Sequence, residues 1–174
     1  MRAQPRSAAA IGITKAPARV ARVEEAIDAH ARDLDLCQAV GDRHGKATAW
    51  NNLGVALREA GRVEEAIDAH TRDLDLCQAV GDRHGKATAW NNLGVALREA
   101  GRVEEAIDAY VKALAVHRAF EDWYRAGQTI GNLALAHEDA DRPADAHTHW
   151  LQAAEAYIRA NAPTEATELD ETDT

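Results

Sequence analysis

Residues 23–62 read VEEAIDAHARDLDLCQAVGDRHGKATAWNNLGVALREAGR, and residues 63–102 repeat this string with one change, Thr71 in place of Ala31. A third, looser copy occupies residues 103–142, where the opening VEEAIDA and the central Asn132-Leu133 are kept. Self-similarity at a period of about 20 to 50 residues is typical of proteins that stack one structural unit many times. We therefore expect a repeat array, in which each unit contacts its neighbours, instead of a single globular core.

Each unit predicts two antiparallel helices. In the second copy, Gly81 is suited to end one helix and Asp82 to cap the next. Apolar and small residues then recur at steps of three and four, which places them on one helix face; they are Ala87, Trp90, Leu93, Gly94 and Leu97. Gly101 supplies a turn, and Glu104 and Glu105 begin the following helix, where acids suit the helix dipole. Because neither helix can bury its apolar face alone, stacking must stabilise both.

Counting outward predicts an all-α solenoid of about seven helices over residues 18–160. One helix without a partner, about 18–40, precedes three pairs: 43–60 with 63–80, 83–100 with 103–120, and 123–140 with 143–160, the last starting near Pro143. We expect the basic residues 1–17 and the acidic residues 161–174 to be disordered. The uncovered side of the first helix leaves three arrangements open: the arm folds back over it, two chains meet there, or the chain is part of a longer protein.

Charge and composition exclude several classes of partner. The chain has 20 basic and 29 acidic residues, a net charge of −9, and a phosphate-backbone binder would need a basic face. No apolar run approaches the roughly 18 residues of a membrane span. The basic start is too short in its apolar part for a signal peptide, with an organellar presequence as the alternative. Cys37 and Cys77 share one repeat column. Equivalent positions on stacked helices usually lie about 10 Å apart, beyond the reach of a disulfide, which predicts reduced thiols and a cytoplasmic protein.

The pattern Trp90-x2-Leu93-Gly94-x2-Leu97, then Gly101, then Ala106-x3-Tyr110, resembles the tetratricopeptide repeat signature. The other repeats carry the same columns: Trp50, Leu53, Gly54, Leu57, Gly61, Ala66 and His70 in the first, and Ile130, Leu133, Ala134, His137, Ala146 and Trp150 in the third. With forty residues instead of the usual 34, the unit resembles the long repeats of kinesin light chains and of many bacterial regulators.

This resemblance implies a non-enzymatic scaffold whose first helices line a concave groove that takes a peptide or partner segment. The implied lining is Thr48, Asn51, Asn52, Val55, Arg58 and Glu59, then Thr88, Asn91, Asn92, Val95, Arg98 and Glu99, then Gln128, Gly131, Asn132, Leu135, Glu138 and Asp139.

Within this lining, the column Asn52, Asn92 and Asn132 can form a ladder along a peptide, because an amide offers two donors and an acceptor to a peptide backbone. The alternative is that these amides bridge neighbouring helices. Arg58 and Arg98 could bind carboxylates or remain solvated charges. The third repeat has Glu138-Asp139 where the second has Arg98-Glu99, so a partner could prefer one direction.

Three further patterns point away from an enzyme. His30-x2-Asp33 and His70-x2-Asp73 predict structural pairs, with the Trp indole as a further partner, since no nucleophile accompanies them. Cys37-x6-His44 and Cys77-x6-His84 lack zinc-site spacing, and the third copy has His117 and Tyr124 there. No glycine-rich phosphate loop occurs. We therefore expect no metal, no cofactor and no nucleic-acid or membrane partner.

Two other functions stay open. The chain could be a structural module that self-associates through its uncovered ends, giving a homo-oligomer. It could also be the C-terminal sensor part of a bacterial signalling or transcription regulator.

Overall fold

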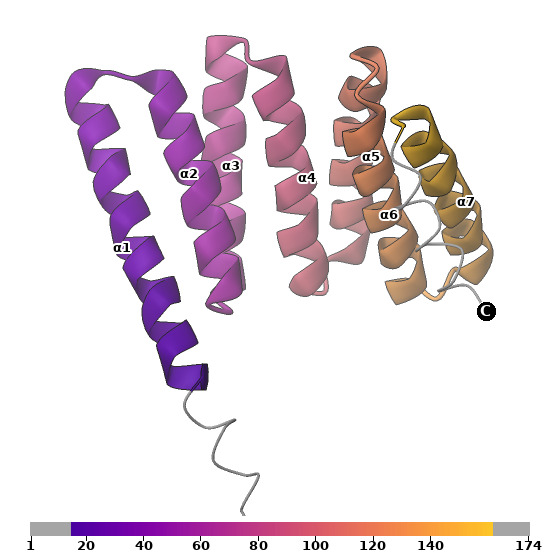
Figure 1. Cartoon of the computed structure of the whole chain (residues 1–174), viewed down its shortest axis with the longest axis horizontal. Coiled ribbons are helices and arrows are strands. Elements are labelled where there is room, and N and C mark those ends of the chain that lie inside the picture. Colours follow the sequence, from indigo (N-terminus) through magenta and orange to yellow (C-terminus); the bar gives the residue numbers. More distant parts are fainter. Residues whose placement is uncertain (1–14, 162–174) are drawn as a thin grey trace, which may run out of the picture.

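Seven helices and no strand make up residues 15–161, which the computed structural model describes, with side chains from residue 19 onward (Figure 1). The helices are α1 (Lys15–Val40), α2 (Arg43–Glu59), α3 (Val63–Val80), α4 (Arg83–Glu99), α5 (Val103–Ala119), α6 (Trp123–Asp139) and α7 (Pro143–Arg159). The predicted all-α solenoid is confirmed, and the ends of α2 to α7 agree with the prediction to within one residue. α1 begins three residues before the expected position 18, and residues 1–14 and 162–174 lie outside the described range.

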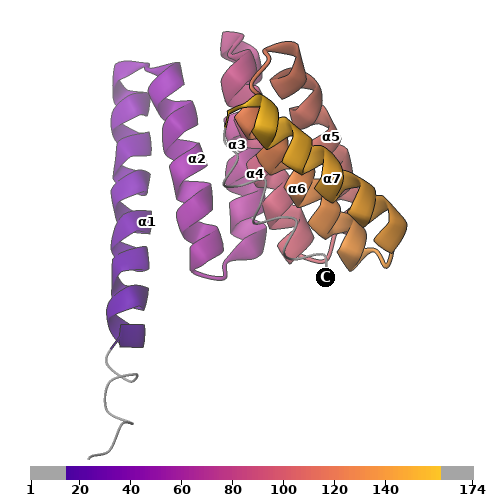
Figure 2. The ribbon, with the colours of Figure 1, turned by 45° about the vertical axis from the view of Figure 1, so that its right-hand side comes forward.

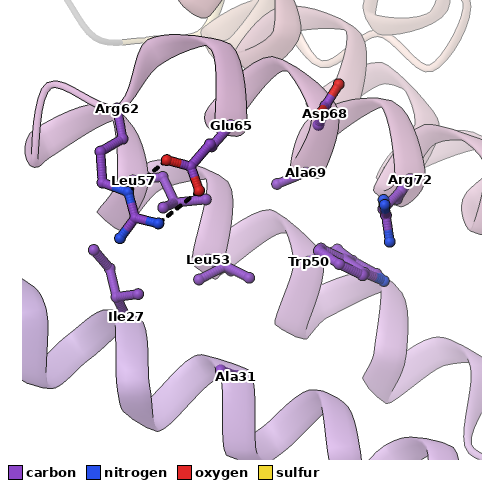
Figure 3. A pocket seen from close by; sticks show the side chains of 10 residues that line it. All are labelled: Ile27, Ala31, Trp50, Leu53, Leu57, Arg62, Glu65, Asp68, Ala69 and Arg72. Carbon is purple, nitrogen blue, oxygen red and sulfur yellow. Dashed lines mark hydrogen bonds and ion pairs between the residues drawn. The ribbon is translucent and has the colours of Figure 1, made fainter.

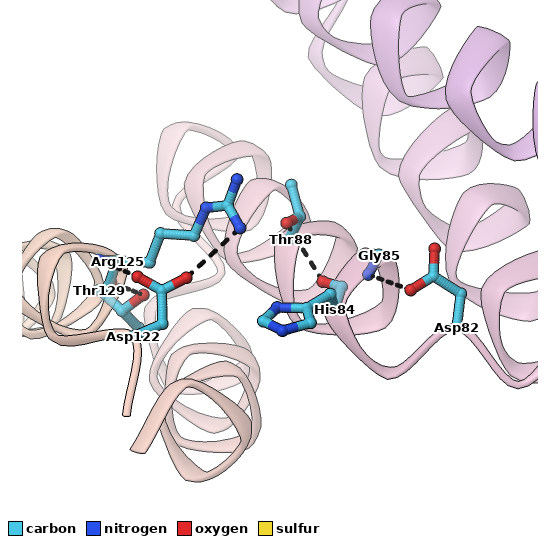
Figure 4. A network of polar contacts seen from close by, with 7 residues as sticks. All are labelled: Asp82, His84, Gly85, Thr88, Asp122, Arg125 and Thr129. Carbon is cyan, nitrogen blue, oxygen red and sulfur yellow. Dashed lines mark hydrogen bonds and ion pairs between the residues drawn. The ribbon is translucent and has the colours of Figure 1, made fainter. Parts of the chain in front are cut away.

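Short polar side chains and glycines set the helix ends. The Asp82 carboxylate accepts a hydrogen bond from the backbone N–H of Gly85 at 2.8 Å at the start of α4 (Figure 4). Asp122 does the same for the N–H of Arg125 at 3.2 Å at the start of α6. Gly81 closes α3 with a φ of 75°, in the left-handed region that favours glycine. The end signals predicted at Gly81 and Asp82 therefore operate in the folded chain, and Asp122 acts in the same way in the third repeat.

The helices form two rows on opposite sides of the stack (Figures 1 and 2). Besides contacts between consecutive helices, α2 contacts α4 and α4 contacts α6, whereas α1, α3, α5 and α7 do not contact one another within the described residues. Helices on the inside of a curved stack lie closer together than those on the outside. We call α2, α4 and α6 the inner row, which faces the concave side, and α1, α3, α5 and α7 the outer row.

Glycines of the inner row let large rings pack against the helix backbone. A Cβ added to Gly54 would lie 2.6 Å from Cε1 of His70, and one added to Gly94 would lie 2.6 Å from Cε1 of Tyr110. Both rings are almost fully buried, at 1% and 0% exposure. In these two helix pairs, a ring on the outer row thus fills the space opposite a missing side chain on the inner row.

Candidate functional site

Asparagine side chains of the inner row join into one chain of hydrogen bonds. Nδ2 of Asn132 donates to Oδ1 of Asn91 at 3.1 Å, and Nδ2 of Asn92 donates to Oδ1 of Asn51 at 2.8 Å. Longer bonds within each helix, Asn91 to Asn92 at 3.5 Å and Asn51 to Asn52 at 3.4 Å, connect these links. We call these five half-buried residues the asparagine ladder; it crosses from α6 through α4 to α2.

The ladder leaves part of its hydrogen-bonding capacity free. Each donating Nδ2 uses one of its two hydrogens, and neither Nδ2 of Asn52 nor Oδ1 of Asn132 has a partner within the described residues. The hydroxyl of Thr129 also donates to Oδ1 of Asn91, at 3.2 Å. The amides therefore bridge neighbouring helices, which is the alternative weighed from the sequence, and they retain donors for a further ligand.

A hollow of about 470 Å³ opens beside the α4–α6 part of the ladder. Its lining is Asn91, Asn92, Gln128, Gly131, Asn132, Leu135, Trp150 and Tyr157. The first six were predicted from the sequence, whereas Trp150 and Tyr157 of α7 were missed. A signal for them exists: Gly131 stands where the earlier repeats have Asn51 and Asn91, and a Cβ there would lie 3.4 Å from Cζ3 of Trp150. The absence of a side chain exposes the indole to the hollow.

The remaining predicted groove residues make mostly local contacts. The hydroxyls of Thr48 and Thr88 donate to carbonyl oxygens one turn earlier in their own helices, at 3.2 and 3.3 Å. Val55 and Val95 are half-buried on the inner row. The two threonines therefore present their methyl groups more readily than their hydroxyls to a ligand.

Arg58 and Arg98 face carboxylates of the following repeat. Nη1 of Arg58 lies 2.8 Å from Oε1 of Glu99, and Nη1 of Arg98 lies 3.4 Å from Oδ2 of Asp139. Glu138 instead accepts a hydrogen bond from the indole N–H of Trp150 at 2.8 Å. Exposed pairs of this kind contribute about 0–1 kcal/mol each, so a ligand carboxylate could compete for either guanidinium.

The predicted pair of His70 and Asp73 does not form. Asp73 instead accepts a hydrogen bond from the thiol of Cys77 at 3.3 Å, and Nδ1 of His70 has no hydrogen-bond partner in the described part of the chain. The reason is that the His70 ring lies against Gly54 of the facing helix. Burial lowers the pKa of His70 to about 4 and raises the pKa of the Asp73 carboxyl to about 6.

Hollows of another kind repeat along the outer side (Figure 3). One, of about 330 Å³, is lined by Trp50 on one side, where the Arg72 guanidinium lies 4.7 Å from the ring centroid. Arg62, bound to Glu65, lines the opposite side. One repeat later, the same columns surround Trp90 in a hollow of about 260 Å³, where Thr71 replaces Ala31. Trp50 and Trp90 therefore face the outer side, unlike Trp150, which lines the hollow beside the asparagine ladder.

The described residues contain no group of three or more His, Cys, Asp or Glu side chains placed to hold a metal ion. Cys37 and Cys77 are both free thiols. Within the same residues, every helix is too short or too polar to cross a membrane.

The family model for the tetratricopeptide repeat matches residues 18–79 and 85–159. The chain belongs to the tetratricopeptide repeat family. Members of this family are protein-interaction scaffolds and are generally not enzymes. No curated protein matches the sequence.

Several solved structures share the fold of this tetratricopeptide repeat chain. The apo form of RapI has a TM-score of 0.78 at 11% identity, over 85% of this chain and 54% of that one. A Rap protein complexed with Competence and Sporulation Factor has a TM-score of 0.74 at 14% identity, over 88% and 49%. A putative kinesin light chain of Podosopora anserina with nearly identical repeats has a TM-score of 0.67 at 17% identity, over 87% and 85%.

The predicted resemblance to kinesin light chains and bacterial regulators is thus confirmed at the level of the fold. The chain spans about half the length of the Rap proteins that it matches.

Proposed function

We propose that the concave side binds an extended peptide or a partner segment, which the asparagine ladder holds by its backbone. The observation that carries this proposal is the row of half-buried amides, each with an unused N–H, beside a hollow of about 470 Å³. A half-buried donor without a partner gains more from a ligand carbonyl than an exposed one that water already satisfies. One structural neighbour was solved with a bound factor, which supports a binding role for this fold.

The surroundings of the ladder suit a peptide with both apolar and charged side chains. Val55, Val95 and Leu135 supply a half-buried apolar strip, and Trp150 and Tyr157 supply an aromatic wall. Because the amides are already bonded to one another, binding costs little of their side-chain entropy. The third repeat carries acidic residues where the first and second repeats carry Arg58 and Arg98. This difference in charge along the groove favours one orientation of the bound peptide.

The proposal includes a cytoplasmic location and excludes nucleic acid, membranes and cofactors as partners. The net charge of −9 opposes binding to phosphate backbones or anionic lipid surfaces. Two free thiols in one repeat column suit a reducing compartment.

The test is a selection of peptides from a random display library on the full chain, followed by affinity measurements on variants. The variant Asn52→Ala/Asn92→Ala/Asn132→Ala should bind the selected peptides at least about tenfold more weakly, since several backbone hydrogen bonds are lost. The control is Thr71→Ala, which restores the first copy's residue on the outer side. Equal binding by the triple variant and the control would refute the role of the ladder. Asn92→Ala alone should stay within about 1 kcal/mol of the wild-type stability.

A second candidate is self-association through α1, where Leu36 and Val40 are 65% and 78% exposed. Light scattering over a concentration series tests it, and a strict monomer excludes it. A related possibility is the sensor part of a bacterial signalling regulator, which fits a chain that covers about half of each matched Rap protein. The neighbouring reading frame in the source genome tests that possibility.

A further inference from the structure

The first and third helices share one sequence but not one environment. Ala69 and Asp73 of α3 are 1% and 3% exposed, whereas Ala29 is exposed and the Asp33 side chain of α1 is 59% exposed. Further equivalent positions differ in the same sense. We call the affected residues the bare face of α1: Ala26, Ala29, His30, Asp33 and Leu36, with Cys37 at its edge. Each has an identical counterpart in α3. Cys37 is half-buried because its Sγ lies beside Gly45 of α2.

The structure itself shows what could cover this face, which no described helix covers in α1. Within the described residues α3 contacts α2 and α4, whereas α1 contacts α2 only, the helix that follows it. In α3, these residues are buried because α2, the inner-row helix that precedes α3, packs on them. No described helix precedes α1, so the same residues of α1 are more exposed. At its centre the His70 ring lies against Gly54 of α2. Since the bare face of α1 is identical in sequence, the same helix fits it, with Gly54 opposite His30.

We propose that the bare face of α1 binds an inner-row helix with the sequence pattern of α2, supplied by a segment outside the described residues. The required features are a glycine opposite His30 and the small and apolar residues that surround Gly54 in α2. A second copy of this chain cannot supply such a helix, because α2, α4 and α6 each lie between two outer-row helices. The first and last described helices, α1 and α7, both belong to the outer row.

One residue of the bare face, Asp33, should weaken the binding of a covering helix. Covering α1 takes the Asp33 carboxylate out of water, as α2 does for Asp73, and a buried carboxylate without a cationic partner is costly. A neutral amide avoids most of this cost, so Asp33→Asn should bind the helix more tightly than the wild type does. A contact made only through nonspecific apolar adhesion would not show this gain.

The test uses the full chain and a synthetic peptide of residues 42–60, which includes the capping Asp42. Binding is read as protection of Cys37 from maleimide, located by mass spectrometry, with the buried Cys77 as the internal reference. We expect saturable protection of Cys37 by at least about fivefold, as burial limits thiol reactivity. A Gly54→Leu peptide should give none, because its side chain would occupy the place of the His30 ring. Asp33→Asn in the chain should lower the peptide Kd by at least about threefold.

Covalent linkage keeps the proposal testable if the free peptide is too little helical to bind. In this linked variant, residues 42–62 replace residues 1–22, so that the added helix joins Val23 as α2 joins Val63. The linked helix should protect Cys37 and raise Tm by at least about 5 °C. Failure of protection in both formats overturns the proposal, and so does equal protection by the Gly54→Leu peptide.

Two further results distinguish this surface from the others. Protection of Cys37 by raised concentrations of the chain alone would show that a second copy is the occupant, contrary to the proposal. The Asn52→Ala/Asn92→Ala/Asn132→Ala variant should still bind the helix, because its changes lie on the concave side. Loss of helix binding in that variant would contradict a separate site.

Discussion

The first two copies of the repeat differ by one residue in forty, yet they bury different parts of themselves. In the first copy, Nδ1 of His30 lies 3.6 Å from Oδ2 of Asp33, whereas in the second the equivalent carboxylate bonds to Cys77 and the imidazole packs on Gly54. The sequence determines which faces a helix has. The neighbouring helices determine which of those faces are buried, and hence the partners of the polar groups.

The largest expected effect concerns the face that is covered in both copies. Leu34 and Leu74 are 9% and 8% exposed, so Leu34→Ala and Leu74→Ala should each lower the free energy of unfolding by about 2–5 kcal/mol. Urea denaturation followed by circular dichroism measures both. A cost below about 1 kcal/mol for Leu34→Ala would mean that α1 is not packed on α2 as described.

A larger side chain on the face that is buried in α3 and bare in α1 should affect the two copies differently. Ala69→Leu inserts a side chain between α3 and α2 and should cost about 1–3 kcal/mol. Ala29→Leu, at the equivalent exposed position, should stay within about 0.5 kcal/mol. Thermal and urea denaturation of both variants provide the comparison. Similar costs for the two would show that a cover lies over α1 in solution.

The equivalent acids allow a charge-based version of the same comparison. Burial raises the pKa of the Asp73 carboxyl to about 6, so its contribution to stability is present below about pH 4 and is lost as the pH rises through 6. At pH 7 the Asp73 carboxylate is mostly ionised although it is buried, and this destabilises the folded state. Asp73→Asn should therefore stabilise the protein by about 1–3 kcal/mol. Asp33→Asn, whose side chain is 59% exposed, is the matched control and should change little. A loss of stability in Asp73→Asn would contradict the assignment.

The smallest effect expected in the wild type is the slope of its stability against pH. Burial lowers the pKa of His70 to about 4, so its contribution to stability is present above about pH 6.5 and is lost as the pH falls through 4. Between pH 4 and 6 this slope opposes that of Asp73, and the two nearly cancel in the wild type. Asp73→Asn removes one of them, so its stability should fall by about 1.4 kcal/mol for each pH unit of acidification. A pH-independent Asp73→Asn variant would refute a buried, neutral His70.

The sequence was sufficient to predict features that depend on one unit or on the period. The helix number, the cap at Asp82 and the turn at Gly81 follow from local signals within the repeated unit. The sequence was insufficient where a side chain can contact either its own helix or the helix that faces it. His70 can reach Asp73 within its own helix, but the ring packs on Gly54 instead.

Contacts between repeats were also beyond a single-sequence argument. The link from Asn92 to Asn51 depends on how closely α2 and α4 approach, which spacing along one helix does not specify. Trp150 entered the concave hollow because Gly131 removes a side chain from the inner row. The sequence did contain a signal for this contact, because Gly131 replaces the asparagine that the first two repeats have at the same position.

The asparagine ladder also has a polarity. Both links between helices donate from Nδ2 to the preceding inner-row helix, from Asn132 to Asn91 and from Asn92 to Asn51. The links within α4 and α2 continue the same donor-to-acceptor series, from Asn91 to Asn92 and from Asn51 to Asn52. The amide dipoles are thus aligned head to tail, with a free donor at the Asn52 end and a free acceptor at the Asn132 end. Hydrogen bonds in such a series polarise one another. Each additional repeat would therefore lengthen this directional series of amides. A peptide bound there, as we propose, would meet a donor at one end of the series and an acceptor at the other.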